Sequence, residues 1–412
     1  MNSTGLALVL GASVAISASS TASADGGAGL PFRDETTRSS VVAPPTAAPG
    51  HVIIGYVFSR EEPIDPRAID AGKLTHINYA FANVEDGEVV EGFARDAENL
   101  RVLTGLRREH SDLKILVSVG GWTWSGGFSD AAVTTQSRQR FVDSAVRFVL
   151  AHDLDGFDVD WEYPGLPGYG NTHRPEDREN FTALMSELRT ALDAAGAGAG
   201  RHYLLTFAAG AFPDFLAHVE MDKVQAVVDY VNLMTYDFRE AGGDSLTGHH
   251  AALYLHPGDS KRLSADGAVR DFVGAGVPPD KLVLGVPFYG RVWGQVQGTD
   301  DGLLQRGAPP TERIDTSYTA LAALVGQDGF ARHWDSWAQA PYLWNPERRL
   351  FVTYEDPESL RVKSRYIREH GLAGAMFWEY GADRTGALLQ TLFDGLRHRG
   401  ERPGTSRPPM TE

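Results

Sequence analysis

The chain has 412 residues, of which 42% are hydrophobic and 22% are charged, a composition typical of soluble globular proteins. Its 54 acidic residues outnumber its 38 basic residues and give a formal net charge of −16, which argues against nucleic acid or an anionic membrane surface as a partner. Cysteine is absent, so the sequence excludes disulfides, zinc–thiolate sites, iron–sulfur clusters and thiol nucleophiles.

The two ends of the chain differ in composition from the rest. Residues 1–24 contain an apolar stretch from Leu6 to about Ala18, too short to span a membrane, and then small residues that suit a signal-peptidase site. We therefore expect a signal peptide and a protein that is secreted to the extracellular space. Residues 25–50 are expected to be a flexible leader and residues 397–412 a flexible tail, which leaves residues 51–396 as one body.

Short apolar runs recur along this body and are predicted to be β-strands. The runs are Val52–Phe58, Leu74–Val84, Leu113–Val119, Leu154–Trp161, Tyr203–Ala208, Tyr230–Thr235, Leu282–Phe288 and Leu372–Trp378. Amphipathic stretches lie between many of them and predict helices at Gln136–Ala151, Arg178–Leu192 and Pro357–His370, the last with Asp356 as its N-cap.

Strands that alternate with helices indicate an α/β protein with a parallel sheet, and eight such units favour a closed (β/α)8 TIM barrel. A doubly wound open sheet remains the alternative, because a count of strands does not show closure. The segment between the seventh and eighth runs is too long for one helix, so residues from about 291 to 355 are predicted to form an inserted subdomain.

The fourth run carries the most unusual pattern, Asp155-Gly-Phe-Asp-Val-Asp-Trp-Glu162. Side chains alternate along a strand, so Asp158, Asp160 and Glu162 share one face while the apolar residues between them face the outer helices. Three buried carboxylates roughly 7 Å apart repel one another and lose solvation, which stability alone would not favour. The pattern predicts a proton-transfer site with a raised pKa; an exposed acidic strand or a calcium loop are the less favoured alternatives.

This motif resembles the signature of glycoside hydrolase family 18, the chitinases. Other segments agree in order with that family: Gly55-Tyr56, Asn78–Phe81, Ser118–Trp122, Met234–Asp237, Tyr289–Arg291 and Met376–Glu379. The resemblance implies a TIM barrel with a small α+β insertion between the seventh and eighth strands. It also implies a chitinase that cleaves β-1,4 linkages between N-acetylglucosamine units by a retaining, substrate-assisted mechanism with an oxazolinium intermediate.

The resemblance further implies roles for individual residues. Glu162 would be the general acid, Asp160 would bind the acetamide N–H, Asp158 would share a proton with Asp160, and Tyr236 would donate to the acetamide oxygen. Trp378 would form the floor of the reactive subsite. The remaining substrate-site candidates are Trp122, Tyr56, Phe81, Ser118, Met234, Asp237 and Arg291, and the structural residues of the motifs are Asp155, Gly120 and Gly121.

We expect no cofactor and no metal, since His249, His250 and His256 do not have the spacing of metal ligands on a helix. His250 stands where relatives usually carry Asn. The expected partner is chitin or a chito-oligosaccharide, with no nucleic acid or membrane partner, and the protein is expected to be a monomer. Two alternative functions remain: an endo-β-N-acetylglucosaminidase acting on N-glycans, and a chitin-binding lectin, which would typically lack the acid that Glu162 supplies here.

Overall fold

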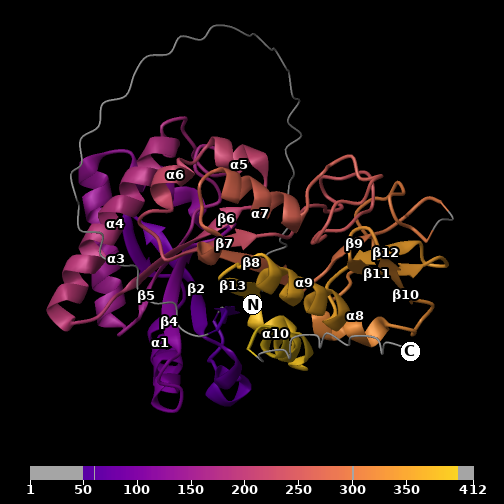
Figure 1. Cartoon of the computed structure of the whole chain (residues 1–412), viewed down its shortest axis with the longest axis horizontal. Coiled ribbons are helices and arrows are strands. Elements are labelled where there is room, and N and C mark those ends of the chain that lie inside the picture. The colour runs from indigo at the N-terminus through magenta and orange to yellow at the C-terminus, as the bar shows by residue number, and fades with distance from the viewer. Residues whose placement is uncertain (1–49, 60, 299–300, 398–412) are drawn as a thin grey trace, which may run out of the picture.

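A computed structural model describes residues 50–59, 61–298 and 301–397 of the chain (Figure 1). The predicted signal peptide, almost all of the predicted leader and all but the first residue of the predicted tail lie outside the described residues.

Eight parallel strands form a closed barrel at the centre of the molecule (Figure 1). They are β1 (Val52–Phe58), β2 (His76–Glu85), β4 (Lys114–Gly120), β5 (Gly156–Asp160), β6 (Leu204–Gly210), β7 (Tyr230–Met234), β8 (Leu282–Pro287) and β13 (Gly374–Trp378). β1 pairs with β2 on one edge and with β13 on the other, so the ring has no open edge. The predicted TIM barrel and its eight strands are confirmed, and the open doubly wound sheet is wrong.

Helices pack around the outside of this barrel. Their bounds are α1 (Asp96–Gly105), α2 (Phe128–Ala132), α3 (Thr135–Ala151), α4 (Asp177–Ala199), α5 (Pro213–Ala217), α6 (Met221–Val224), α7 (Ala265–Gly274), α9 (Pro357–Glu369) and α10 (Ala387–Arg397). The predicted cap of α9 is confirmed, because the Asp356 carboxylate accepts the N–H groups of Glu358 and Ser359. α4 continues past its last large apolar residue, Leu192, through an Ala-rich turn and ends at Ala199, with Gly200 as its C-cap at a φ of +64°.

One element was not predicted from the sequence. β3 (Glu88–Glu91) forms an antiparallel hairpin with the end of β2. Between β8 and β13 the chain forms a second, antiparallel sheet beside the barrel, with β9 (Arg291–Trp293), β10 (Ala331–Asp335), β11 (Ala340–Asn345) and β12 (Leu350–Thr353) together with helix α8 (Tyr318–Leu324) (Figure 1). Within the described residues, no helix is long and apolar enough to cross a membrane.

The two faces of β5 differ as the alternation of its residues predicts. Outward-facing Trp161 is fully buried, stacks on Phe128 of α2 at 5.4 Å and meets the edge of Phe181 of α4. Phe157 meets the edge of Phe141 of α3. These contacts hold β5 against three helices, so the position of its inward-facing carboxylates is set by a packed apolar layer behind them.

Gly120 allows the end of β4 to approach β5 closely. Its φ is +106°, and a Cβ added there would lie 2.4 Å from the carbonyl oxygen of Asp160. The N–H of the next residue, Gly121, donates to that same oxygen at 2.8 Å. A side chain at Gly120 would therefore push β4 away from β5, the strand that carries the acidic motif.

We expect Gly120→Ala to lower the free energy of unfolding by about 2 kcal/mol, because the new Cβ meets backbone and φ is unfavourable for an L residue. Urea unfolding measures the change. Gly198→Ala is the matched control, since nothing lies within 4 Å of a Cβ there and Ala favours the helix more than Gly. A Gly120→Ala protein as stable as the control would contradict this account.

Candidate active site

The inward-facing carboxylates lie at the carboxyl end of the barrel, where the loops after the strands meet. Asp158 and Asp160 are the inward residues of β5 and Glu162 follows its end. All three are buried, with Asp158 at 0% exposure. Since the carboxyl ends of barrel strands are where catalytic residues of this fold gather, this is the candidate active site.

Asp158 is held by donors from four different strands. Its Oδ2 accepts the hydroxyls of Tyr56 of β1, at 2.9 Å, and Ser118 of β4, at 2.7 Å. Its Oδ1 accepts the Thr206 hydroxyl of β6, at 2.5 Å, and the Asn232 amide of β7, at 3.1 Å. Burial raises the pKa of Asp158, and these four hydrogen bonds oppose that rise.

Of these four donors, Thr206 and Asn232 were not among the predicted site residues. Both are single polar residues on strands that are otherwise apolar. Each faces inward and is at most 1% exposed. That combination of a lone polar residue and an inward register is the signal that could have found them.

Asp160 lies next along the strand and has very different surroundings. Its Oδ1 is buried and has no hydrogen-bond partner among the described residues. Burial raises the pKa of Asp160 well above its ordinary value, and the charges of Glu162 and Asp158 raise it further. The surroundings of Asp160 therefore favour its protonated form, whereas the donors around Asp158 favour the charged form of that carboxylate.

Ser125 fixes the backbone between the two upper carboxylates. Its hydroxyl lies 2.9 Å from the carbonyl oxygens of Gly121 and Asp160 and accepts the N–H of Glu162 at 2.9 Å. Ser125 was also not predicted, because nothing in its loop distinguishes it from a solvent-exposed serine.

Glu162 has the pKa expected of a general acid. Burial raises its pKa to about 7, the charge of Asp237 adds to the rise, and a hydrogen bond with Tyr163 opposes it. A substantial fraction of Glu162 therefore keeps its proton at neutral pH.

Asp237 is the fixed negative charge of the site. Its Oδ1 accepts the Arg291 Nε–H at 2.7 Å and its Oδ2 accepts the Tyr289 hydroxyl at 2.8 Å. Burial alone would raise the pKa of Asp237, but the Arg291 charge and hydrogen bonds from His250 and Arg291 hold it well below its usual range. The same pairing raises the pKa of Arg291. Arg291 thus contacts Asp237 directly.

His250 is a further contact of Asp237 that the sequence indicated only as a departure from relatives. It is 0% exposed, its Nδ1 lies 3.5 Å from the Asp237 Oδ1, and its ring meets the edge of Tyr289 at 5.4 Å. Burial lowers the pKa of His250, although Asp237 opposes this. The neutral imidazole supports the carboxylate without adding a second cation. His249 is separate from this group and pairs with Asp335 at 3.0 Å.

Aromatic side chains form one wall of the site. Trp378, half-buried at the end of β13, stacks on Phe81 with ring centroids 5.3 Å apart and packs against Tyr56 at 5.9 Å. The Tyr236 hydroxyl lies 3.9 Å from the Met376 sulfur, and Met234 packs into the same cluster. The structure therefore brings these predicted residues together around one apolar surface.

Trp122 lies after β4 and contacts other aromatic rings. Its ring lies 6.5 Å from that of Tyr163, the residue after Glu162, and 6.3 Å from that of Tyr169. Asp155 lies at the opposite end of β5, where its carboxylate accepts the Ile115 N–H and pairs with Arg107 and Arg201. Among the described residues, no group of three or more His, Asp or Glu side chains is arranged to hold a metal.

Comparison with known families decides what kind of protein has this site. The family described as glycosyl hydrolases family 18 matches residues 52–383, most of the chain and all eight barrel strands. The chain belongs to glycosyl hydrolase family 18. The resemblance seen in the acidic motif is thereby confirmed.

The relatives of this family 18 protein include chitinases. Chitinase A1 from Niallia circulans is 36% identical over 428 aligned positions, which cover 87% of this chain but only 60% of that protein's length. Among solved structures, the family 18 N-acetylglucosaminidase from Paenibacillus barengoltzii is 45% identical with a TM-score of 0.77, over 84% of this chain and 99% of its own. The Ostrinia furnacalis Group IV chitinase, solved with allosamidin, is 29% identical with a TM-score of 0.75, over 83% and 97% of the two chains.

The raised pKa of Glu162 depends in part on the Asp237 anion. We expect Asp237→Asn to lower the Glu162 pKa below its starting value of about 7, because the uncharged amide no longer disfavours the Glu162 anion. Carbon NMR of the glutamate carboxyl groups follows the titration directly. Asp112→Asn, which removes an exposed carboxylate, should leave it unchanged. A Glu162 pKa that stays the same or rises in Asp237→Asn would refute this coupling.

Proposed function

We propose that this family 18 protein is a chitinase that hydrolyses β-1,4 linkages between N-acetylglucosamine units by a retaining, substrate-assisted mechanism. The observation that carries the proposal is the row of three carboxyl groups on and after β5. Asp158 accepts four hydrogen bonds, and Asp160 has a raised pKa and a buried oxygen without a partner among the described residues. Glu162 has a pKa of about 7. Family 18 enzymes differ from most glycosidases because a group of the substrate itself takes the place of a second catalytic carboxylate.

In the first step, the Glu162 carboxyl protonates the glycosidic oxygen and the bond from that oxygen to the anomeric carbon breaks. The acetamide carbonyl oxygen of the same sugar attacks that carbon from the opposite face and forms an oxazolinium ion. Trp378 offers an apolar surface beneath the sugar ring, and the Tyr236 hydroxyl donates to the acetamide oxygen. These two half-buried side chains reduce the contact of the developing cation with bulk water.

Asp160 balances the charge on the acetamide. When its proton passes to Asp158, the Asp160 carboxylate accepts the acetamide N–H and stabilises the oxazolinium ion. The hydroxyl groups of Tyr56, Ser118 and Thr206 can each turn from donating to accepting, so Asp158 can take that proton without leaving its place.

In the second step, water adds to the anomeric carbon and gives its proton to the Glu162 carboxylate, which restores the acid. The carbon–oxygen bond of the oxazolinium ring breaks, the acetamide is regenerated, and the proton on Asp158 returns to Asp160. Because the two displacements each invert the anomeric carbon, its configuration is retained overall.

We further propose that residues 1–24 direct the protein out of the cell, that it acts as a monomer, and that its partner is chitin rather than nucleic acid or a membrane. The antiparallel sheet of β9–β12 would then wall one side of the cleft, since Arg291 of β9 reaches Asp237. The lectin alternative is not favoured because Glu162 is retained in the acid's position. The N-glycan alternative is not favoured because Chitinase A1 and the Group IV enzyme named above are chitinases.

Removal of the acid proton tests the proposed mechanism. We expect Glu162→Gln to lower kcat on a chito-oligosaccharide by at least about 100-fold, since an amide cannot protonate the leaving oxygen. Binding of the oligosaccharide, measured by calorimetry, should be retained. Glu347→Gln changes an exposed glutamate and should leave kcat unchanged. Turnover by Glu162→Gln at near the normal rate would contradict the assignment of Glu162 as the general acid.

The stereochemistry of the first products tests the retaining step independently. In a digest of a chitin hexamer, proton NMR should show the β-anomer first, with the α-anomer appearing only by mutarotation. Chromatography of the same digest shows whether internal bonds are cleaved or single sugars are released. An initial α-anomer would exclude the mechanism, and cleavage of a high-mannose glycopeptide alone would exclude the chitinase.

A further inference from the structure

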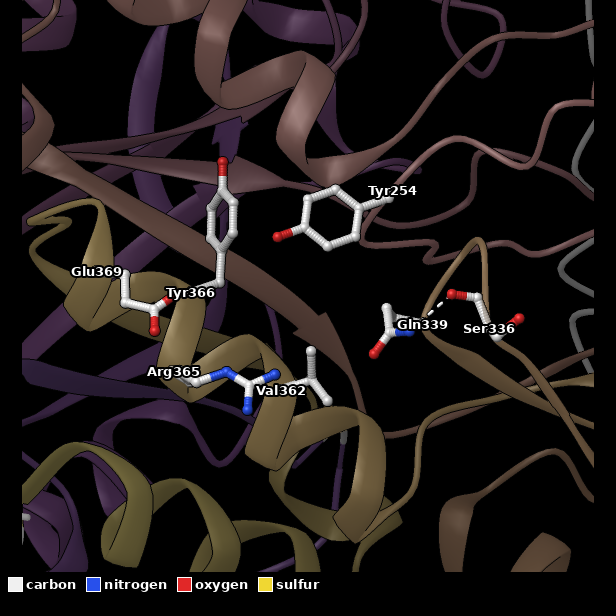
Figure 2. Close-up of a pocket in the computed structure, with 7 residues that line it drawn as sticks. All are labelled: Tyr254, Ser336, Gln339, Val362, Arg365, Tyr366 and Glu369. Carbon is white, nitrogen blue, oxygen red and sulfur yellow. Dashed lines mark hydrogen bonds between the residues drawn. The ribbon is translucent and has the colours of Figure 1, made fainter. Parts of the chain in front are cut away.

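A cavity outside the active site lies between α9 and the turn that joins β10 to β11. Its volume is about 320 Å³, and it is lined by Tyr254, Ser336, Gln339, Val362, Arg365, Tyr366 and Glu369. Figure 2 shows Val362, Arg365, Tyr366 and Glu369 on α9, with Tyr254 above them and Ser336 and Gln339 on the opposing turn. This volume is at the lower limit of small-ligand sites and suits one or two sugar rings.

The cavity lies away from the carboxylates. α9 ends at Glu369 and the chain then enters β13 at its amino end, Gly374. The last turns of α9, which carry Arg365 and Glu369, are therefore directed toward the end of the barrel opposite Glu162. The Tyr366 hydroxyl donates to Asp266 of α7, which places the cavity on the flank between two outer helices.

Two of the large apolar side chains that remain exposed on the described surface lie in or beside this cavity. Tyr254 lines the cavity and is 38% exposed. Trp337 is not one of the lining residues, but it follows Ser336 in the β10–β11 turn and is 64% exposed, the highest value among them. The N–H of Tyr254 donates to the carbonyl of Ala338 at 3.2 Å, so the two aromatic residues lie on adjacent segments. An exposed tryptophan presents apolar surface to water, and a ligand with an apolar face would cover it.

Polar groups that face the cavity have spare hydrogen-bonding capacity. Within the part of the chain that the structure describes, Arg365 and Glu369 form no hydrogen bond or ion pair with another side chain. Both charges nevertheless act on Tyr254. Burial is the main cause that raises the pKa of its hydroxyl, Glu369 raises that pKa further, and Arg365 lowers it. Gln339 uses its amide N–H on the Ser336 carbonyl, and its oxygen remains as an acceptor.

We propose that this flank is a second saccharide-binding site, which holds one or two β-linked N-acetylglucosamine units of a chain other than the one in the active site. A pyranose has an apolar C–H face for Tyr254, and hydroxyl and acetamide groups for Arg365, Glu369 and Gln339. A second ring that extends past Ser336 would reach the exposed Trp337 beside the cavity. A polyanion would be repelled by Glu369, and a purely apolar ligand would leave both charges unpaired. The choice of sugar rests on the proposed function.

A second site changes how the enzyme meets an insoluble polymer. Once the cleft engages one chain, binding of a neighbouring chain at the flank becomes intramolecular and raises the apparent affinity for the solid without any change at the reacting bond. The site would therefore matter for insoluble chitin and not for a short soluble oligomer, which cannot reach both places.

The test uses the full chain carrying Glu162→Gln, so that binding is measured without turnover. Tyr254→Ala combined with Trp337→Ala, and separately Glu369→Ala, should weaken binding to insoluble chitin by about tenfold or more, as read from depletion isotherms. Val273→Ala, which trims an exposed apolar residue on neighbouring α7, is the matched control and should bind normally. Equal isotherms for the control and the aromatic variant overturn the proposal.

The same substitutions in the active enzyme separate this site from the proposed function. The aromatic pair variant should hydrolyse a soluble chitin tetramer at the normal rate and insoluble chitin several-fold more slowly. An equal loss on both substrates would overturn the second site, because it would mean that the cleft had changed. Failure of the unsubstituted protein to cleave any chito-oligomer would count against the proposed function alone, since the binding isotherms do not depend on turnover.

Discussion

The buried carboxylate of Asp158 is the constraint on which the rest of the site depends. It is a charge in the middle of a barrel with no cation beside it among the described residues, and an unpaired buried charge is among the least favourable groups a fold can contain. Four neutral donors compensate, and hydrogen bonds to a charged group contribute about 1.5–3 kcal/mol each. The donors come from β1, β4, β6 and β7, so they converge only when the barrel is closed.

The fixed position of Asp158 affects which of the neighbouring carboxyl groups can be charged. A second anion at Asp160 is disfavoured by burial and by its neighbours, and the anion that does persist nearby is Asp237, neutralised by Arg291 on the far wall. The Asp237 charge and burial both raise the pKa of Glu162, so a substantial fraction of it keeps its proton. Glu162 can therefore act as an acid because the negative charges of the site are carried by other carboxylates.

Much of this arrangement could be predicted from the sequence. The alternation along β5 predicted which side chains face the helices and which face inward, because a period of two leaves no other choice. The barrel followed from eight repeats of one pattern. The family motifs located Tyr56, Ser118, Tyr236, Asp237 and Trp378, which the structure brings to the same end of the barrel.

The remainder depended on contacts between segments that are far apart in the chain. Thr206 and Asn232 are ordinary strand residues until the register places them beside Asp158. Ser125 and His250 lie in loops whose course no local pattern specifies. The hairpin strand β3 and the antiparallel sheet are built from short segments. In the antiparallel sheet, β9 pairs with β12, which lies tens of residues away in the chain. Local propensity is weak for such segments because tertiary pairing decides them.

The closure of the barrel also has a consequence for biosynthesis. β13 supplies the pairing partner for both β1 and β8, and it is the last of the barrel strands that the ribosome makes. Until it emerges, the first and seventh barrel strands expose unpaired backbone edges of the kind that promote aggregation. Trp378 arrives on that same final strand. When β13 pairs with β1 and β8, the nascent chain therefore covers its last unpaired strand edges and completes the aromatic wall of the site at the same time. The site is thus incomplete until the barrel is closed.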